Sequence, residues 1–240
     1  MLSIIIPTLN EEDYLPLLLD SIKEQDFDDY EIIVADAGSV DKTLEIAKHY
    51  NCIITKGGKV AVGRNNGAKV AKGDMLFFLD ADVILPENFL EKTINEFKER
   101  NLDVIGFKIH PFPHKEITYF FVNIFYNRII TKLENKFPHL SAGVLVKREV
   151  FKILNGYDET IKFAEDYDLA RRSVKLFKFG IIKSDELWVS DRRWRKDGWI
   201  KVGIKHLIGE LHTSVIGPVR SDILNYKFNH YKDNDNQKKR

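Results

Sequence analysis

The stretch Met75-Leu76-Phe77-Phe78-Leu79-Asp80-Ala81-Asp82 joins five apolar residues to a pair of carboxylates. A short, continuous apolar run is typical of a strand that is buried on both faces of a parallel sheet. Carboxylates at the end of such a strand are costly unless they meet a cation or hydrogen-bond donors. The stretch therefore predicts a central strand over Met75–Leu79 and a polar site at its carboxyl end.

On both sides of this stretch, short apolar or β-branched runs alternate with helical patterns. We expect strands over Ser3–Ile6, Glu31–Ala35, Cys52–Thr55, Met75–Leu79, Val104–Ile109, Ala142–Val146 and Leu187–Ser190. We expect a loop at residues 110–114 and helices over Tyr14–Lys23, Asp41–His49, Gly63–Ala71, Pro86–Arg100, Ile117–Leu133, Arg148–Leu154, Glu165–Lys178 and Gly198–Ile216. This order predicts an α/β fold with a single Rossmann-like, mostly parallel sheet flanked by helices.

Composition and charge exclude several classes of protein. The chain has 37 Lys and Arg residues against 36 Asp and Glu residues, so we expect no nucleic-acid partner. Its single cysteine, Cys52, can form no intramolecular disulfide, which favours a reducing compartment. The N-terminal apolar run is too short for a secretory signal, and no stretch is long and apolar enough to predict a spanning helix. We therefore expect a cytoplasmic protein.

Polar residues follow three of the expected strands. The first strand leads into Pro7-Thr8-Leu9-Asn10-Glu11, the second into Asp36 and the fourth into Asp80-Ala81-Asp82. The carboxyl ends of parallel strands share one edge of the sheet, and ligands of open α/β sheets bind at this edge. Each residue alone is explained equally well as a helix N-cap, so only their convergence indicates a binding site.

The Asp-x-Asp pattern occurs four times, and its context singles out one pair. The four pairs are Asp26/Asp28, Asp80/Asp82, Asp166/Asp168 and Asp233/Asp235. Only Asp80 and Asp82 follow an apolar strand directly. Hard oxygen ligands at a strand end suit Mg²⁺ or Mn²⁺ together with the oxygens of a bound diphosphate. The sequence has neither a P-loop nor a Gly-x-Gly-x-x-Gly fingerprint, so it predicts a nucleotide-diphosphate site of another kind.

A series of motifs follows in a fixed order along the chain. They are Ser3–Glu11 (SIIIPTLNE), Val34–Thr43 (VADAGSVDKT), Arg64–Ala68 (RNNGA), Gly73–Asp74, Phe78–Asp82 (FLDAD), Ser141–Gly143 (SAG), Gly156–Glu159 (GYDE) and Glu165–Leu169 (EDYDL). In this order they resemble the family two glycosyltransferases with a GT-A fold. The resemblance covers roughly four-fifths of the chain and fades after about Arg195.

The resemblance implies an inverting, nucleotide-sugar-dependent enzyme and a role for each matching residue. The residues implied in binding the nucleotide-sugar are Pro7, Thr8, Asn10, Glu11, Asp36, Arg64, Asp80, Ala81 and Asp82. Asp36 would accept a hydrogen bond from the base, Asp80 would lie by the ribose, and Asp82 would hold Mg²⁺ or Mn²⁺ on the diphosphate. Many members place a second acid two residues after the base contact, where this chain has Gly38.

The same resemblance implies that Asp166 is the catalytic base, with Glu165 beside it. Sugar transfer requires a base for the incoming hydroxyl, which Asp166 can supply. The alternative is that Asp166 is only a first-turn acid that the helix dipole stabilises. Glu165, Asp166 and Asp168 place three acids within four residues, which is more than a cap requires.

Two stretches of the second half of the chain concern the acceptor. Residues Ile117–Ile130 are apolar on most sides, and residues Arg192–Lys205 are basic. They fit either a core helix with a solvated basic face or a surface that meets a lipid-linked acceptor and anionic headgroups. Arg192 and Arg193 would also clamp the donor diphosphate. We place four residues on the acceptor or diphosphate side: Gly143, Glu165, Arg192 and Arg193.

These inferences define one expected protein. A single GT-A domain would cover residues 1–220, with a nucleotide-binding half of about 1–103 and an acceptor half of about 104–220. Residues 221–240 would form a tail whose end is disordered. The donor would be a UDP- or GDP-sugar, and the acceptor a hydroxyl or lipid-phosphate group on a glycan or a lipid-linked molecule. The protein would make peripheral contact with the cytoplasmic face of the membrane.

Two other classes of protein are weighed against this one. A nucleotidyltransferase would carry a glycine-rich loop with Arg and Lys directly after the first strand, and Pro7–Glu11 has none of these residues. A non-catalytic module that binds nucleotide-sugars would have no need for Asp166.

Overall fold

The computed structural model describes residues 1–113, 115–134, 136 and 138–221. Its strands are β1 (Leu2–Thr8), β2 (Tyr30–Asp36), β3 (Ile53–Lys56), β4 (Met75–Leu79), β5 (Val83–Ile84), β6 (Val104–Phe112), β7 (Gly143–Lys147) and β8 (Phe179–Ser190). Its helices are α1 (Leu15–Lys23), α2 (Thr43–His49), α3 (Val60–Val70), α4 (Phe89–Glu99), α5 (Glu116–Val122), the π-helix η1 (Asn123–Asn127), α6 (Arg128–Lys132), α7 (Arg148–Ile153), α8 (Glu165–Ser173), α9 (Arg192–Asp197) and α10 (Trp199–Val215). Apart from Ser221, the expected tail lies outside the described residues.

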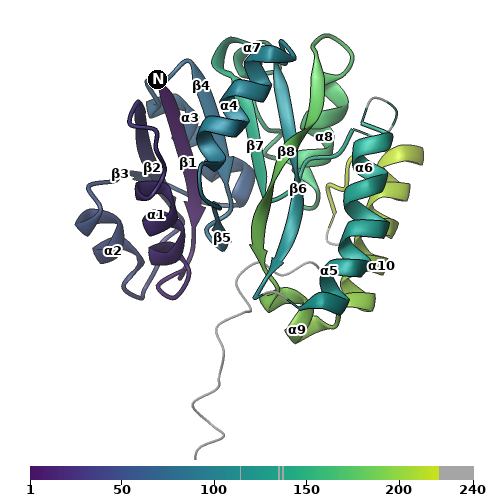
Figure 1. Cartoon of the computed structure of the whole chain (residues 1–240), viewed down its shortest axis with the longest axis horizontal. Helices are drawn as coiled ribbons and strands as arrows, with labels where there is room; N and C mark the ends of the chain where they lie inside the picture. Colours follow the sequence, from purple (N-terminus) through teal and green to yellow (C-terminus); the bar gives the residue numbers. More distant parts are fainter. Residues whose placement is uncertain (114, 135, 137, 222–240) are drawn as a thin grey trace, which may run out of the picture.

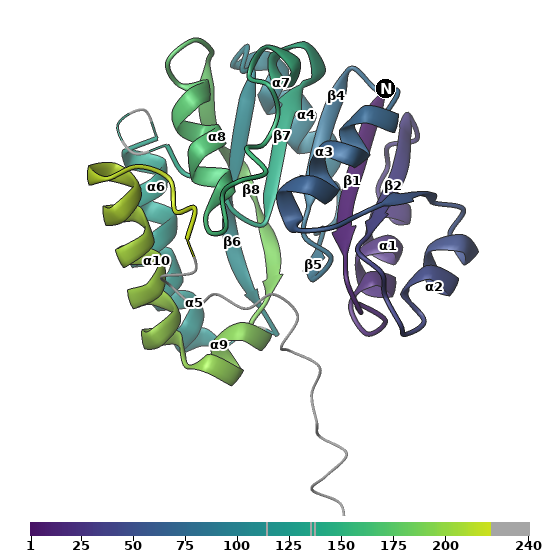
Figure 2. The same ribbon diagram turned by 180° about the vertical axis from the view of Figure 1, so that it is seen from behind.

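The described strands form one sheet with helices on both faces, which confirms the expected α/β class (Figures 1 and 2). Side chains of β1 alternate between two cores: Ile4 and Ile6 pack in a cluster with residues of α1, α2 and α4. Ile5 packs in the other cluster, with residues of α3, α7 and α8. Burial of both faces explains why Ile4–Ile6 of β1 and all of β4 form continuous apolar runs.

The sheet order is β3-β2-β1-β4-β7-β6-β8-β5, and it combines both directions of pairing. Strands β1 to β4 pair in parallel, as do β6 and β8. Strand β7 runs antiparallel to both β4 and β6. Strand β5 pairs antiparallel with β8 at the far edge. Strands from the two halves of the chain therefore share one sheet.

The sheet must curl strongly, because β4 and β5 are joined by three residues only, Asp80, Ala81 and Asp82. Three other strands lie between β4 and β5 in the sheet order. In a flat sheet this separation would be about 19 Å, whereas the connecting chain can span at most about 14 Å. The Asp-x-Asp residues thus cross the mouth of the curl, and Asp82 O accepts a hydrogen bond from Ser190 N at 3.0 Å.

Several boundaries in the second half of the chain differ from those expected. The helix predicted to reach Lys178 ends at Ser173, and β8 begins at Phe179 rather than near Leu187. Strand β8 is interrupted opposite Phe107 and Lys108, where three polar residues, 183–185, bulge out of the register. Because the polar residues interrupt the apolar pattern, the sequence predicted only the last part of β8 as a strand.

The loop predicted at 110–114 was also wrong in part, because β6 continues to Phe112. Residue 114 lies outside the described part of the chain. Pro111 pairs with Val189 of β8, while the β7 pairing of β6 covers only Val104 and Ile105. A proline is compatible with a strand where the ladder on one side has ended.

The predicted helix Ile117–Leu133 is present as α5, η1 and α6, which follow one another directly. Both views show this helical segment side by side with α10 (Figures 1 and 2). In the described part of the chain, no helix has the length and apolar character needed to cross a bilayer.

Candidate functional site

The carboxyl ends of β1, β2 and β4 meet at one edge of the sheet, as predicted. Thr8 and Asp36 are register partners, and Thr8 Oγ1 donates a hydrogen bond to Asp36 Oδ1 at 3.1 Å. Gly143 of the antiparallel strand β7 reaches the same edge as the partner of Leu79. Asp80 follows immediately, and its backbone N donates to Ala142 O at 2.9 Å.

The Asp36 carboxylate organises the loop after β2. Its Oδ2 accepts hydrogen bonds from the backbone N of Gly38 and of Ser39, both at 2.9 Å, and its Oδ1 accepts from Ser39 Oγ. Gly38 has a φ of 96°, in the left-handed region that favours glycine. This backbone conformation gives a physical reason for glycine at the position where relatives of the expected family place an acid.

Asn10 ties the loop after β1 to the loop after β2. Its backbone N donates to Ser39 Oγ at 2.8 Å, and its Oδ1 accepts from Val40 N at 2.9 Å. Asn10 itself has a φ of 56°, a conformation that Asn tolerates better than most residues. The residue expected to line a nucleoside pocket therefore holds the two loops together.

Arg64 is the centre of a buried charge cluster. Only 2% of its side chain is exposed, and its Nη2 donates to Asp80 Oδ1 at 2.8 Å. Its Nη1 donates to Glu165 Oε1 at 3.1 Å and to Asp166 Oδ1 at 2.6 Å. The guanidinium also lies 5.1 Å from the ring centroid of Tyr157. Arg64 thus joins the end of β4 to the start of α8.

Glycines of α3 explain how an arginine comes to lie so deep. A Cβ atom at Gly63 would lie 3.3 Å from Pro7 Cβ, and one at Gly67 would overlap Ile5 Cγ2. The two glycines therefore let α3 approach β1 closely, which places Arg64 at the sheet edge rather than in solvent. The small residues of this helix are required for the position of the charge.

Arg192, at the start of α9, is the centre of a second cluster. Its Nη1 and Nη2 donate to the two carboxylate oxygens of Glu11 at 2.7 and 2.8 Å. Its Nε donates to Asp82 Oδ2 at 2.8 Å. The guanidinium lies 4.6 Å from the ring centroid of Tyr14. Burial raises the pKa of Asp82, and Arg193 lies near enough for its charge to oppose that rise.

Negative charge exceeds positive charge across the two clusters. Five carboxylates, those of Glu11, Asp80, Asp82, Glu165 and Asp166, surround two guanidinium groups. Burial raises the pKa of Glu11 and of Asp82 despite the bonds that each makes to arginine. Burial likewise raises the pKa of Asp166, and burial together with Asp166 raises the pKa of Glu165 to about 7. The site is therefore suited to a ligand that brings positive charge.

The remaining predicted residues contribute backbone rather than side chains. Ala81 is buried in the core between the two Asp-x-Asp carboxylates. A Cβ at Gly143 would lie 2.9 Å from Leu187 Cδ2, so its open side faces the core rather than the site. The sequence pattern predicted no role for Tyr14, Ser39 or Tyr157. Ser39 and Tyr157 belong to the quoted motifs, whereas no motif indicated Tyr14.

The residues are compatible with a divalent metal ion but do not enclose one. In residues 1–221, wherever side chains are described, no three Asp, Glu, His or Cys side chains are grouped to hold an ion. Magnesium sites commonly use only one or two carboxylates, with phosphate and water oxygens completing the shell. Asp80 and Asp82 stand at the two ends of the three-residue crossing, and Asp82 Oδ2 accepts a hydrogen bond from Arg192 Nε at 2.8 Å.

Comparison with known proteins gives the same family at the level of sequence. The model for the family described as Glycosyl transferase family 2 matches residues 3–152. An uncharacterized glycosyltransferase, EpsJ of Bacillus subtilis strain 168, is 30% identical over 184 residues. The match covers 69% of this chain and 54% of EpsJ, so the chain spans about half the length of that relative.

Solved structures share the fold. The mannosyltransferase PcManGT from Pyrobaculum calidifontis, in complex with GDP-Man and Mn²⁺, has a TM-score of 0.74 at 19% identity, and the match covers 93% of this chain and 68% of that one. TarS 1-349 of S. aureus, in complex with UDP-GlcNAc, has a TM-score of 0.65 at 22% identity, and the match covers 79% of this chain and 58% of that one. These likenesses confirm the expected GT-A fold.

Proposed function

The chain belongs to glycosyl transferase family 2, and we propose that it transfers a sugar from a nucleotide-diphosphate sugar to an acceptor hydroxyl. The observation that carries the proposal is the meeting of three groups at one sheet edge. Thr8 and Asp36 lie at the ends of β1 and β2, while Arg64 joins Asp80 to Asp166. These groups supply a place for a nucleoside, a place for a diphosphate and a base.

The nucleotide would bind along the ends of β1, β2 and β4. Asp36, held by the loop after β2, would meet the base, and Asp80 would meet the ribose. Backbone groups of Pro7 and Ala81 would line the same path, beside Thr8 and Asn10. One solved relative of this fold binds UDP-GlcNAc and another binds GDP-Man, so we propose a UDP- or GDP-sugar as the donor.

Asp82 would hold Mg²⁺ or Mn²⁺ against the donor diphosphate, and PcManGT, whose fold is similar, binds Mn²⁺. The ion would supply positive charge to the departing diphosphate. Arg192 occupies Oδ2 of Asp82 and both oxygens of Glu11. When a donor binds, we expect Arg192 and Arg193 to turn toward the diphosphate, for which a guanidinium is a good bidentate partner.

Asp166 would act as the base. The acceptor oxygen forms a bond to the anomeric carbon, the bond from that carbon to the diphosphate oxygen breaks, and Asp166 takes the hydroxyl proton. Attack from the face opposite the leaving group inverts the configuration. The raised pKa of Asp166, next to Glu165 in the buried cluster, favours this role, because a base works best when its pKa approaches the operating pH.

The acceptor would be a glycan or a lipid-linked molecule that approaches from the second half of the chain. Exposed apolar side chains, among them Phe120 of α5 and Ile204 and Ile208 of α10, lie on the two helical segments that run side by side (Figure 2). Lys201 is exposed on the same helix as the two isoleucines. Such a surface suits contact with the cytoplasmic face of an anionic membrane, and we include that contact in the proposal.

A thermal-shift panel tests the donor site. UDP, GDP, ADP, CDP and pyrophosphate are each added with and without Mn²⁺, to the native chain and to the Asp36→Ala variant. We expect one nucleoside diphosphate to raise the melting temperature most, and to do so only with Mn²⁺. Asp36→Ala should reduce the shift from that nucleotide and leave the shift from pyrophosphate unchanged. Equal stabilisation by all five ligands, or by none, would refute the proposed donor site.

A further inference from the structure

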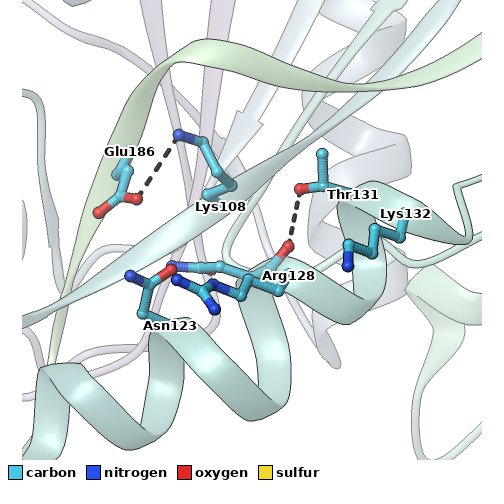
Figure 3. A pocket seen from close by; sticks show the side chains of 7 residues that line it. Lys108, Asn123, Arg128, Thr131, Lys132 and Glu186 are labelled. Atoms are coloured by element: carbon cyan, nitrogen blue, oxygen red, sulfur yellow. Dashed lines mark hydrogen bonds and ion pairs between the residues drawn. The ribbon is translucent and has the colours of Figure 1, made fainter.

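A pocket of about 360 Å³ lies between the strand pair β6/β8 and the helical segment η1–α6, apart from the two charge clusters (Figure 3). Its lining includes Lys108, Asn123, Arg128, Thr131, Lys132 and Glu186. We propose that this pocket binds a phosphate group of the acceptor. The inference rests on the proposed function only where it identifies the ligand as an acceptor; the binding of phosphate is an independent property.

Most of the surface inside the pocket is apolar, and the charged residues that border it favour an anion at its mouth. Among the described residues around the pocket, three are cationic, Lys108, Arg128 and Lys132, and one is acidic, Glu186. Glu186 is already shared, because Lys108 Nζ lies 3.5 Å from its Oε1 and His110 Nδ1 lies 3.5 Å from its Oε2. An excess of positive charge therefore remains, and a phosphate accepts hydrogen bonds from both guanidinium and ammonium groups.

The helical segment holds these cations in place. Asn127, fully buried at the end of η1, donates from Nδ2 to Ile109 O and accepts at Oδ1 from Ile109 N, both at 2.9 Å. These two bonds pin the segment to β6 beyond the point where β7 ends. Arg128, Thr131 and Lys132 follow at helical spacings of three and four, so they face the same side. A π-helix such as η1 is uncommon and often occurs at functional sites.

A strip of aromatic side chains leads from the pocket toward the donor site. Lys108 and Glu186 are register partners, and so are His110 and Trp188 one step further along the strands. Alternate residues of a strand lie on one face, so these four side chains share a face of the sheet. Ring centroids of His110 and Trp188 are 5.6 Å apart, and 37% of Trp188 is exposed.

The strip ends where transfer would occur. Ser190 follows Trp188 on the same face, and its backbone N bonds to Asp82 O. Ser190 is four residue steps along the strand from Glu186, a length of about 13 Å. An extended acceptor with its phosphate in the pocket would cross the exposed Trp188 ring and place a hydroxyl several atoms away near Asp82. The hydroxyl that accepts the sugar would then lie roughly 13 Å from the acceptor phosphate.

Titration calorimetry with glycerol 3-phosphate, in the presence of saturating UDP and Mg²⁺, tests the pocket directly. The Arg128→Ala/Lys132→Ala variant should bind this probe at least about 10-fold more weakly, since it loses two charged donors. A matched control, Lys98→Ala/Lys152→Ala, removes two exposed lysines from α4 and α7 and should bind as the native chain does. UDP affinity should be unchanged in both variants.

A second variant tests whether the charge of the pocket, rather than its shape, determines probe binding. Glu186→Gln removes the one carboxylate of the pocket while keeping its shape, so it should strengthen probe binding by about 2- to 10-fold. Weaker binding in Glu186→Gln, equal binding in Arg128→Ala/Lys132→Ala, or no binding to the native chain at millimolar probe would overturn the proposal. If the native chain binds the probe but binds neither UDP nor GDP, only the proposed donor site is refuted.

Vesicles distinguish the two sources of the phosphate. Sedimentation of the protein with phosphatidylcholine vesicles is compared with and without phosphatidic acid, for the native chain and for Arg128→Ala/Lys132→Ala. If the acceptor phosphate belongs to a lipid, phosphatidic acid should increase binding of the native chain and not of the variant. If it belongs to a glycan, glycerol 3-phosphate binding should depend on the two cations while vesicle binding does not.

Discussion

Arg192 Nε donates to Asp82 Oδ2 at 2.8 Å, although 110 positions of sequence separate the two residues. The carboxylate proposed to hold a metal ion is thus neutralised by a guanidinium from the other half of the chain. Since Arg192 also bonds both oxygens of Glu11, it can give up Asp82 and keep a partner. Metal binding at Asp82 is therefore expected to break one of the three bonds that join Arg192 of α9 to the sheet edge.

Replacing Asp82 should abolish the metal dependence of nucleotide binding. In Asp82→Ala the ion would be held by phosphate and water oxygens alone, while Arg192 keeps its pair of bonds to Glu11. Calorimetry with the preferred nucleoside diphosphate, with and without Mn²⁺, measures the difference. Asp26→Ala, which alters an exposed Asp-x-Asp pair in a loop, is the control. Unchanged Mn²⁺ dependence in Asp82→Ala would show that the metal site is elsewhere.

The variant Asp166→Asn should distinguish a catalytic role of Asp166 from a helix-capping role. Asp166→Asn keeps the side-chain shape but cannot take a proton, so we expect the turnover rate to fall by about 10²- to 10⁴-fold with donor binding nearly unchanged. Transfer is measured to soluble and lipid-phosphate acceptors. Asp168→Asn is the matched control, because Asp168 lies on the same helix and bonds Arg172 Nε at 2.7 Å. If Asp166→Asn transfers sugar as fast as the native chain does, Asp166 is not the base.

The buried carboxylates should make the free energy of unfolding depend on pH. Burial and the neighbouring Asp166 raise the pKa of Glu165 from about 4.5 to about 7, while Arg64 acts in the opposite direction and Asp80 adds to the rise. Between these two pKa values the folded chain binds more protons at Glu165 than the unfolded chain does. This group therefore makes the protein less stable as pH rises from about 4.5 to about 7.

Urea unfolding at pH 5 and pH 7.5 measures this effect. Glu165→Gln removes the titrating group and keeps its size, so the loss of stability between the two pH values should be smaller in the variant than in the native chain. Glu96→Gln is the control: burial acts to raise the pKa of Glu96, but bonds to Ser184 and Arg100 outweigh it and lower that pKa below 4.5. Glu96 is therefore ionised in both states between pH 5 and pH 7.5, and its variant should keep the pH dependence of the native chain. An identical pH dependence in the native chain and Glu165→Gln would contradict the assigned shift.

The close packing of α3 against β1 can be tested by replacing Gly67 of α3 with alanine and comparing it with a control glycine in α10. A Cβ at Gly67 would overlap Ile5, which is fully buried and β-branched and so cannot turn aside. Gly67→Ala should therefore lower the free energy of unfolding by about 1–3 kcal/mol. A Cβ at Gly203 of α10 would have no neighbouring atom within 4 Å, so Gly203→Ala should be neutral or stabilising by up to about 1 kcal/mol. Equal changes in the two melting temperatures would refute this account of α3.

The strands β1 to β4 follow closely from the sequence because each contains a short run of apolar residues. Met75–Leu79 is a strand over the range that its pattern predicts. Thr8, Asp36 and Asp80 lie at or just after the carboxyl ends of β1, β2 and β4. These ends share one edge of the sheet because the three strands run parallel. Local pattern and long-range pairing agree for β1 to β4, so simple periodicity is sufficient there. Strand β5, Val83–Ile84, was not predicted, because two residues are too few to form a pattern.

The second half of the fold was less accessible to prediction. Strand β8 contains the polar bulge at residues 183–185, and its pairing with β6 depends on partners about 75 residues away. The site shows the same limit: Arg64 bonds Glu165 and Asp166 across 101 and 102 positions. The sequence indicated that each residue belongs to the site, but only tertiary structure brings the three side chains together.

The curl of the sheet has a consequence for how the molecule could be divided. Strand β4 pairs with β7, and β5 pairs with β8. Strands from before residue 103 therefore flank the strands β7, β6 and β8 on both sides. A chain cut near residue 103 would yield one fragment with two unsatisfied strands and a second fragment with two complementary edges. Neither fragment would hold a finished Asp-x-Asp crossing by itself. If sugar transfer is recovered when the two fragments are mixed, the fragments have reassembled into one sheet.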